Sequence, residues 1–570
     1  MTRHLITSAL PYINGVKHLG NLVGSMLPAD VYARYSRARG FDTLFVCATD
    51  EHGTPAELAA MDAGQDVAAY CTEQHEIQKS LGERFDLSWD VFGRSSSAQN
   101  TELTQHFARI LWQRGFLEVR TTRQVYSHAE KRFLPDRYVI GTCPHCGYER
   151  ARGDQCENCT RVLDPTDLIN PRSAVSGSAD IEIRDSAHLF LKQSQFVEKL
   201  RAWIDSHEAD WPALVKSIAR KWLDEGLNDR GITRDLTWGV PVPDDIGDGK
   251  LKGKVFYVWF DAPIEYIGAT KEWADANGKG DEWQKWWRPA PPSDVTYFQF
   301  MAKDNVPFHT VGFPVTVMAS GENWKLVDRI KGFNWLTYYG GKFSTSQHRG
   351  VFMDAALDLQ PADAWRWYLM ANAPESADTS FTWELFASAV NKDLADVFGN
   401  FVNRVTKFTV SRFEGRVPEI GEYGADEKAL MADLDSRIAR YTAFLDDIEY
   451  RKALAELRAI WVAGNEYLTK AAPWTHVKTD RAAAAVGVRM GLNLVRLFAA
   501  LSSPVIPTLA KAAWSAFGAA PDVLPWPDRP MAEYLDGLAH GAAVTPPPVL
   551  VTKISDDQIA AWKARFGGED

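Results

Sequence analysis

The sequence lacks three features that would assign it to a special class of protein. No run of about 18 consecutive apolar residues, the length that spans a bilayer, occurs in it. Its first residues, MTRHLITSALPYI, lack the sustained apolar stretch of a signal peptide. It also contains no long low-complexity tract and no visible internal repeat. We therefore expect a cytoplasmic globular protein that has no membrane partner.

An excess of positive charge is also missing. The formal net charge is -11, which argues against a protein that coats nucleic acid without sequence preference. A local basic face that binds RNA remains compatible with this balance. The length of 570 residues exceeds what one hydrophobic core supports, so we expect several domains.

Cysteine is scarce, but four of the six cysteines are clustered. Cys47 and Cys71 lie in apolar or helix-like stretches and are expected to be inert buried thiols. The others form the knuckles CPHC and CENC, with nine residues between them: Cys143, Cys146, Cys156 and Cys159. Two such knuckles complete a tetrahedral zinc site, whereas two disulfides would suit an oxidising compartment. Because four sulfurs fill the coordination sphere, we expect one structural zinc.

The first fifty residues have the pattern of a βαβ unit. The run HLITSAL is typical of a strand, residues 18–40 carry apolar side chains at helical spacing, and TLFVCATD is a second apolar strand. This order predicts an α/β, Rossmann-like parallel sheet, whose ligand lies beyond the carboxyl ends of the strands. Residues 12–21 and 50–52 should meet at that edge.

Later segments predict an insertion, the rest of the sheet and a helical region. KVFYVWFDAP (254–263), TYFQFMA (296–302) and FPVTVMA (313–319) are interpreted as strands. The expected division is 1–114 first half of the catalytic domain, 115–235 insertion with the zinc knuckle, 236–330 second half, 331–385 a stem-contact region, 386–545 an all-α helical bundle and 546–570 a tail.

Two short segments have the composition of phosphate-binding loops. His18-Leu19-Gly20-Asn21 opens the first helix, whose N-terminus suits an anion. A helix cap or surface residue is the alternative, and the absence of GxGxxG disfavours a dinucleotide site. Residues 340–346, GGKFSTS, place a lysine and hydroxyl groups after a Gly-Gly hinge. Alone, they are more typical of a solvated surface loop.

Together these segments resemble the class I aminoacyl-tRNA synthetases, whose signatures are HIGH and KMSKS. HLGN stands for the first and KFSTS for the second. Within that class the chain resembles the methionyl-tRNA synthetase family over essentially its full length. The motifs occur in order: ALPYINGVKHLGN, ATDEHGTP, the zinc knuckles, YVWFDAPIEY, KDNVPFH, GGKFSTS, GNFVNR and AAPW.

The resemblance implies activation of L-methionine by ATP with Mg²⁺, then transfer to the 3′-terminal adenosine of initiator and elongator tRNA(Met). It implies catalytic roles for His18, Asn21 and Lys342. The ATP-binding positions would be His18, Gly20, Asn21, Lys342, Ser344 and Thr345. The methionine pocket would comprise Ala9, Leu10, Tyr12, Asp50, Trp259, Ala262, Pro263, Tyr266 and His309, with Asp50 facing the substrate ammonium. Trp259 has an alternative interpretation as the core residue of an alternating strand.

The resemblance assigns anticodon binding to the helical region. On a helix over 398–411, Asn400, Arg404, Lys407 and Ser411 share one face, and Phe401, Val405 and Phe408 share another. Asn400, Arg404 and Trp474 match the anticodon-binding positions of the family. Asp396 stands where some members carry an amide.

One departure concerns the phosphate side of the site. Thr345 replaces the second lysine of the KMSKS signature, and Lys331, Arg349 or a metal ion are the candidates to compensate. The rival hypotheses are another class I synthetase and a non-catalytic tRNA-binding or zinc-ribbon adaptor. Since no appended dimerising domain follows the helical region, we expect a monomer.

Overall fold

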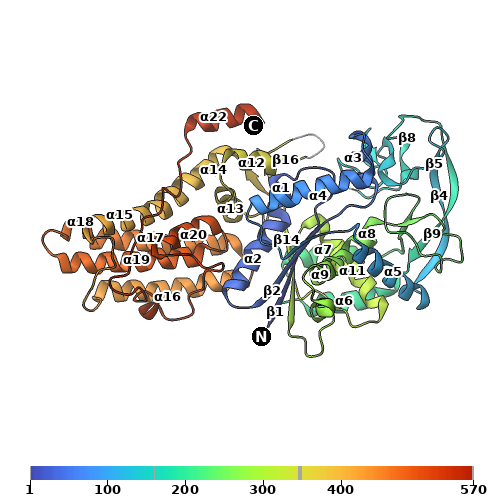
Figure 1. Ribbon diagram of the computed structural model, residues 1–570. Coiled ribbons are helices and arrows are strands. Elements are labelled where there is room, and N and C mark those ends of the chain that lie inside the picture. Colours follow the sequence, from blue (N-terminus) through green and yellow to red (C-terminus); the bar gives the residue numbers. More distant parts are fainter. Residues whose placement is uncertain (1, 160, 345–348, 568–570) are drawn as a thin grey trace.

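A computed structural model describes residues 2–159, 161–344 and 349–567. Its centre is a five-stranded sheet in the order β14-β13-β1-β2-β3, with every neighbouring pair parallel (Figure 1). The strands are β1 (Arg3–Ser8), β2 (Asp42–Thr49), β3 (Val91–Arg94), β13 (Val295–Ala302) and β14 (Arg329–Phe333). The predicted doubly wound parallel sheet is confirmed.

Both faces of this sheet are covered, which explains why its strands are almost continuously apolar. Along β2, Phe45 and Cys47 belong to the core that includes helix α2 (Leu27–Ala38). Leu44 and Val46 belong to a second core with helices α5 (Ala98–Gln113) and α9 (Glu265–Ala276). Alternate side chains of one strand therefore serve opposite faces.

Two of the predicted strands are mainly helical. In KVFYVWFDAP only β12 (Val255–Phe256) is extended, and α8 (Val258–Asp261) follows at once. FPVTVMA lies in α11 (Phe313–Ser320). Short apolar runs fit a buried helix as well as a strand. Pro314 at the helix start and Gly321, in the left-handed conformation at the end of α11, are the signals that favour a helix there.

Two strands of the sheet, β3 and β14, were not predicted from the sequence. β3 has only four residues and contains Gly93, which is poor in strand propensity. β14 includes Arg329 and Lys331, whose charges break the apolar pattern of a buried strand. The buried part of Lys331 is tolerated because its ammonium lies 2.9 Å from Glu375.

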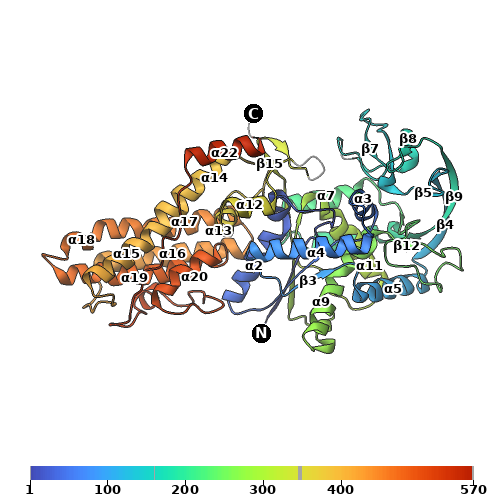
Figure 2. The ribbon, with the colours of Figure 1, turned by 45° about the horizontal axis from the view of Figure 1, so that its top comes forward.

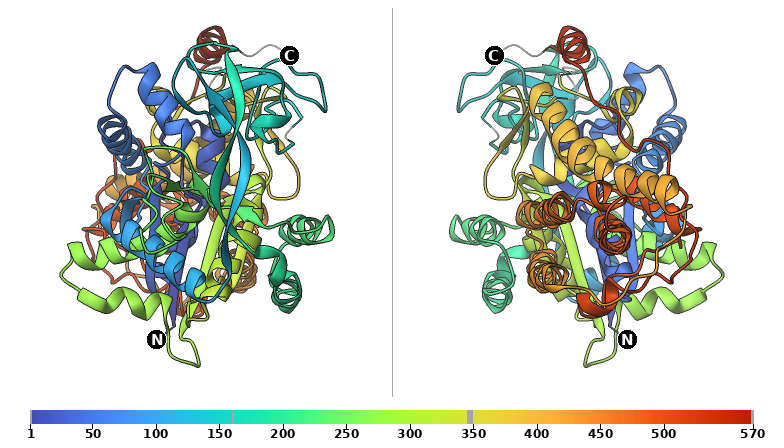
Figure 3. Two further views of the ribbon diagram at one scale, coloured as in Figure 1. Left: turned by 90° about the vertical axis from the view of Figure 1, so that its right-hand side faces the viewer. Right: turned by 90° about the vertical axis from the view of Figure 1, so that its left-hand side faces the viewer.

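Residues 117–234, which follow α5, add further strands and helices beside the sheet. A long hairpin pairs β4 (Leu117–Ser127) with β9 (Ile181–Leu191), and a small sheet pairs β6 (Val139–Thr142) with β7 (Ala151–Arg152) and β8 (Ile169–Ser173). Further elements there are β5 (Arg132–Phe133), α6 (Val197–Ser206), α7 (Ala213–Asp224), β10 (Arg230–Gly231) and β11 (Thr233–Arg234). Figure 3 shows this hairpin, in cyan, at the end of the molecule that faces away from the C-terminal helices.

The opposite end of the molecule is helical (Figure 2). Its helices are α15 (Asn400–Arg412), α16 (Ala425–Asp446), α17 (Tyr450–Ala471), α18 (Pro473–His476), α19 (Arg481–Ser502), α20 (Pro507–Trp514) and α21 (Met531–Tyr534). α19 alone among the described helices is long and apolar enough to cross a membrane, with a mean hydropathy of 1.5. Because 89% of that window is buried, α19 is the core helix of this domain. The predicted all-α region is confirmed.

Between the sheet and the helical domain lie the elements that carry the KFSTS segment. They are β15 (Leu336–Tyr338), β16 (Gly341–Lys342), α12 (Met353–Leu359), α13 (Ala362–Ala371), β17 (Thr379–Phe381) and α14 (Trp383–Ala389). The C-terminal helix α22 (Asp556–Phe566) returns to this region, where Trp562 packs on Trp383 and Lys563 lies 2.8 Å from Glu384.

Candidate functional site

His18 and Asn21 cap the first helix after β1 reciprocally. The backbone N–H of Asn21 donates to Nδ1 of His18 at 3.2 Å, and the backbone N–H of His18 donates to Oδ1 of Asn21 at 3.2 Å. Nδ1 therefore carries no proton, and Nε2 carries the ring N–H. Burial, followed by the charge of Lys17, lowers the pKa of His18 to about 3. His18 is thus a neutral hydrogen-bond donor at physiological pH.

The two signature segments lie against each other. The ring of Phe343, within KFSTS, lies 5.0 Å from that of His18, and the backbone of Phe352 forms a β-bridge with His18. Gly20 permits this packing, because a Cβ there would lie 3.0 Å from Nδ1 of His18 and 3.6 Å from Phe343. HLGN and KFSTS, more than 300 residues apart in the sequence, form one site.

Lys342 is exposed at this site, with Nζ 4.7 Å from the centroid of the Trp335 ring. Ser344 forms a backbone bridge with Arg349, while Thr345 lies outside the described residues. Lys331 and Arg349, the two residues considered as substitutes for the missing lysine, both have partners in the protein. Lys331 pairs with Glu375 at 2.9 Å, and the Arg349 guanidinium donates to the carbonyl of Tyr338 at 3.2 Å.

Asp50 follows β2 and lies at the same edge of the sheet. Its backbone N–H donates to Pro11 and its carbonyl accepts from Ile13, both at 2.9 Å. The carboxyl is buried, and within the described chain its Oδ1 has no hydrogen-bond partner. Burial, then the charges of Asp261 and Glu51, raise the pKa of Asp50 well above its ordinary value. The charge of Lys17 and a hydrogen bond with the backbone of His52 act in the opposite direction.

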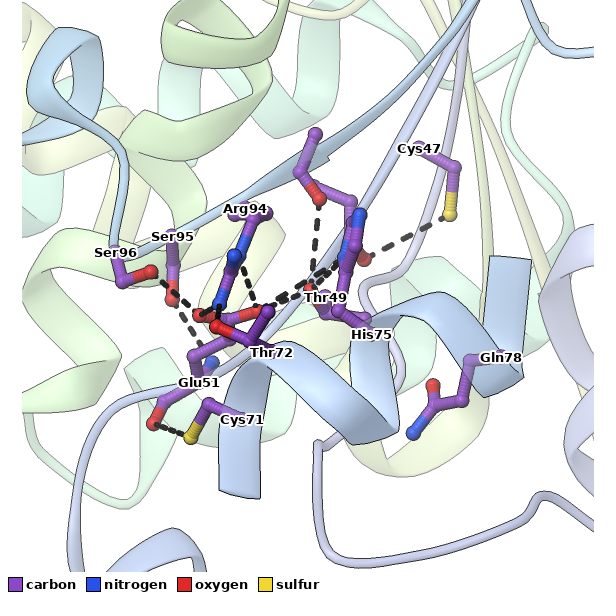
Figure 4. A network of polar contacts seen from close by, with 12 residues as sticks. Cys47, Thr49, Glu51, Cys71, Thr72, His75, Gln78, Arg94, Ser95 and Ser96 are labelled. Atoms are coloured by element: carbon purple, nitrogen blue, oxygen red, sulfur yellow. Dashed lines mark hydrogen bonds and ion pairs between the residues drawn. The ribbon is translucent and has the colours of Figure 1, made fainter. Parts of the chain in front are cut away.

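A buried polar network surrounds Glu51, the residue that follows Asp50 in the chain (Figure 4). Glu51 is fully buried and accepts from both Nε and Nη2 of Arg94, at 2.9 and 3.0 Å. The hydroxyls of Thr49 and Ser96 also donate to Glu51, and Ser95 accepts the Glu51 backbone N–H at 2.9 Å. From the sequence, Glu51 was expected at this edge of the sheet but had no assigned role, and Arg94 was not recognised.

The predicted methionine pocket is assembled from several elements. The hydroxyl of Tyr266 lies 2.8 Å from Nε2 of His309, whose Nδ1 lies 2.8 Å from the carbonyl of Asn305. Since a carbonyl only accepts, Nδ1 carries the proton and Nε2 accepts from Tyr266. Burial lowers the pKa of His309 to about 4, which keeps this ring neutral.

Three aromatic residues belong to the predicted methionine-binding set: Tyr12, Trp259 and Tyr266. The backbone of Tyr12 forms a parallel bridge with that of Asp50, and Tyr12 is 39% exposed. Trp259 packs 4.4 Å from Phe308 and lies under the guanidinium of Arg230 at 4.4 Å. Ala9 and Leu10 lie directly after β1, and Ala262 and Pro263 lie on the short helix Ala262–Ile264. Trp259 is only partly buried, unlike the core residue of the alternative interpretation.

His52 and Asp261 form a second feature that the sequence analysis missed. Nδ1 of His52 lies 2.7 Å from Oδ2 of Asp261, and both side chains are buried. The pair joins the turn after β2 to α8, next to Trp259. The sequence offered a signal, because His52 stands two residues after Asp50 and Asp261 stands next to Ala262.

The four predicted metal ligands converge. The Sγ atoms of Cys143, Cys146, Cys156 and Cys159 all lie within 4.8 Å of one another. Two of the separations are 3.9 Å (Cys143 to Cys159) and 3.6 Å (Cys146 to Cys156). A tetrahedron with Zn–S bonds of about 2.3 Å has edges of about 3.8 Å. The cluster fits a divalent metal such as zinc.

The predicted anticodon residues share one surface of the helical domain. The guanidinium of Arg404 lies 4.3 Å from the centroid of the Trp474 ring, which is 37% exposed. Asn400 is exposed one turn before Arg404 on α15, while Phe401 and Val405 are buried as predicted. The carboxylate of Asp396 forms an ion pair with Lys553 at 2.7 Å. It is therefore not free to contact a base.

Comparisons with known proteins agree with this arrangement. Residues 4–406 match the family described as tRNA synthetases class I (M), and residues 417–570 match the anticodon binding domain of methionyl tRNA ligase. A methionine--tRNA ligase of Maricaulis maris is 62% identical over 100% of this chain and 99% of its own. One from Streptomyces avermitilis is 58% identical over 100% of both chains.

A solved structure, that of Mycobacterium tuberculosis methionyl-tRNA synthetase in complex with methionyl-adenylate, superimposes with a TM-score of 0.77. It is 25% identical and covers 97% of this chain and 100% of its own. Full-length identity near 60% and two family matches leave no large segment of the chain unassigned. The chain belongs to the methionyl-tRNA synthetase family of class I aminoacyl-tRNA synthetases.

Proposed function

We propose that the protein activates L-methionine with ATP to methionyl-adenylate and transfers the methionyl group to the 3′-terminal adenosine of initiator and elongator tRNA(Met). The observation that carries this proposal is the contact of His18 with Phe343. It joins the HLGN and KFSTS segments at the edge of the sheet where Asp50 lies. The methionyl-adenylate complex of the mycobacterial relative supports the same chemistry.

Activation requires the methionine carboxylate to attack the α-phosphate of ATP in line with the departing pyrophosphate. Such a reaction needs positioning and charge stabilisation more than covalent help. His18 donates from Nε2 to phosphate oxygens, and Asn21 and the backbone at Gly20 line the same turn. Lys342 and Ser344 bind the pyrophosphate in this proposal, and the resemblance assigns Thr345 to the same role. Mg²⁺ bound with ATP would supply further neutralisation of the phosphate charge.

The amino acid binds through its charge and its thioether. Asp50 accepts the ammonium group, which supplies the cation that its buried carboxylate lacks. Tyr12, Trp259 and Tyr266 offer aromatic surfaces that suit a polarisable sulfur. The hydrogen bond from Tyr266 to His309 fixes the rear of the pocket at 2.8 Å. Ala9, Leu10, Ala262 and Pro263 complete its lining.

We further propose that the four cysteines bind one structural Zn²⁺. The near-tetrahedral spacing of the sulfurs supports this, and four thiolates leave no open position for substrate. The metal would hold the small sheet of the insertion together, with no part in the reaction. A cytoplasmic, monomeric enzyme and the domain boundaries given above complete the proposal.

tRNA recognition falls to the helical domain in this proposal. Arg404 and Asn400 offer hydrogen bonds to unstacked anticodon bases, and Trp474 offers a stacking plane. The preorganised stack of Arg404 on Trp474 supports this role, because it presents a planar cation and an indole together.

Aminoacylation of unfractionated tRNA from a bacterium tests the whole function. With each labelled amino acid in turn, methionine should be the one attached, and the acceptor should be tRNA with a CAU anticodon. Attachment of another amino acid would favour a different class I synthetase. tRNA binding without attachment of any amino acid would favour the adaptor.

A further inference from the structure

Lys17 is a buried lysine that the proposed mechanism does not use. It precedes His18, and only 5% of it is exposed. Among the described residues its ammonium makes one hydrogen bond, to Oδ1 of Asn14 at 2.9 Å. An ammonium group has three N–H donors, and burying a charge without partners is costly. The unused donors of Lys17 indicate that an anion completes its surroundings.

Asp50, at the same edge of the sheet, has an oxygen that lacks a hydrogen-bond donor. Its Oδ1 is buried and without a partner in the described part of the chain. The backbone of Ile13 bonds to Asp50, and the next residue, Asn14, holds the Lys17 ammonium. The charge of each group acts on the other, yet in the described residues no ion pair joins them. The ammonium of Lys17 and the carboxylate of Asp50 are therefore near each other, and both can form further hydrogen bonds.

We propose that Lys17 binds the α-carboxylate of the amino-acid substrate, so that Lys17 and Asp50 together recognise the two charges of a zwitterion. This inference rests on the proposed function, because it presumes an amino acid in the pocket. It also has a chemical consequence. The carboxylate must approach the negatively charged α-phosphate, and an ammonium beside it reduces their repulsion.

Other cations near the site are already engaged. Lys303 lies 2.8 Å from Asp378, and Lys331 lies 2.9 Å from Glu375. The guanidinium of Arg349 donates to a backbone carbonyl at 3.2 Å. Lys342 is exposed near KFSTS, on the phosphate side. Lys17 is the buried cation that lies nearest in the chain to HLGN and acts electrostatically on Asp50.

The electrostatics of Lys17 give the inference a measurable signature. Burial lowers the pKa of Lys17 to about 7, while the charge of Asp50 acts in the opposite direction. His18, the other titratable neighbour, stays neutral, since its pKa lies near 3. An arriving carboxylate favours the charged form of Lys17 and raises its pKa. At pH 8, where free Lys17 is largely neutral, binding of methionine should take up a proton.

The test compares methionine with methioninol, which keeps the ammonium and thioether but lacks the carboxylate. Dissociation constants are measured by calorimetry for the wild type, Lys17→Met and Lys17→Arg. Lys254→Met is the matched control, because Lys254 is also a buried lysine but pairs with Asp235 outside the pocket. Proton uptake by the wild type is obtained at pH 8 from two buffers of different ionisation enthalpy.

Lys17→Met should weaken methionine binding by about 10-fold or more, as for loss of a charge-assisted hydrogen bond, and leave methioninol binding nearly unchanged. Lys17→Arg should retain much of the preference for methionine, and Lys254→Met all of it. Proton uptake should accompany methionine and not methioninol. If Lys17→Met keeps the wild-type preference, or loses both ligands equally, Lys17 does not bind the carboxylate.

Failure of the proposed function gives a different result, since the wild type itself would then not bind methionine. If Lys17→Met does not fold, proton uptake by the wild type decides. Equal uptake with both ligands, or none with methionine, contradicts the inference.

Discussion

The guanidinium of Arg404 stacks on the ring of Trp474, with 4.3 Å between its central carbon and the ring centroid. One residue is on α15 and the other follows Pro473 at the start of α18, so the contact links two helices of the domain. A cation over an indole keeps both planes ordered before a base arrives. This geometry supports their predicted role in tRNA recognition.

Trp474→Ala should lower aminoacylation of tRNA by about 10- to 100-fold, because stacking on a base contributes about 1–3 kcal/mol. Methionine-dependent exchange of pyrophosphate into ATP should be unchanged, since Trp474 lies in the helical domain. Trp514→Ala is a suitable control, because Arg496 lies 5.4 Å from its ring in the same domain. Equal loss of exchange and aminoacylation in Trp474→Ala would contradict an anticodon role.

His18→Ala should lower the turnover number of pyrophosphate exchange by about 10²–10³-fold, as for loss of one charge-stabilising donor. The affinity for methionine should change little, because His18 faces the phosphates. Kinetics with saturating ligands separate the two effects. A change near unity would remove His18 from the mechanism.

The pH dependence of the wild type provides a further check on His18. Its pKa is lowered to about 3, so its neutral form persists at all pH values above that. Between pH 5 and 8, the pH profile of activity should therefore contain no titration that depends on His18. A titration near pH 6.5 that disappears in His18→Ala would contradict the assigned neutral donor.

Glu51→Gln should alter methionine binding through Asp50. Its unfolding free energy should fall by about 1–3 kcal/mol, as for a disrupted charged hydrogen bond beside a partly exposed arginine. The KM for methionine at pH 8 should rise, with little change in the KM for ATP, because the anchor of Asp50 is weakened. Thermal unfolding and steady-state kinetics measure these effects.

The same variant should also shift a pH profile. Asp50 has a raised pKa, so methionine binding is present above that pKa and lost as the pH falls through it. Burial, Asp261 and Glu51 cause the rise. Removing the charge of Glu51 should move the loss to lower pH. Asp30→Asn, which disrupts the fully buried pair with Arg366, should destabilise the fold without moving this profile.

Metal analysis should find one zinc per chain. Chelation, or Cys156→Ala, should make residues 139–173 sensitive to protease, because the metal joins the two knuckles. The buried thiol variant Cys71→Ala should retain its zinc. A metal-free protein that is fully folded and protease-resistant would overturn the assignment.

Strong local patterns made much of the site predictable. The knuckle spacing indicated four ligands, and the βαβ pattern placed Asp50 near His18. The helical pattern over 398–411 correctly separated Asn400 from Phe401. These inferences needed only short-range periodicity and chain order.

Long-range relationships were not predictable from these patterns. FPVTVMA is an almost entirely buried helix whose mainly apolar residues show no helical period, so only Pro314 and Gly321 at its ends indicated its type. The contact of His18 with Phe343 depends on packing between distant segments. That Lys17 and Asp50 lack hydrogen-bond partners can be seen only in the three-dimensional structure.

The central claim is activation of methionine at the site shared by HLGN and KFSTS. Pyrophosphate exchange into ATP, measured with each of the standard amino acids, tests it most directly. The account predicts that methionine gives the highest rate by a wide margin. A higher rate with another amino acid, or no exchange with any, would contradict it.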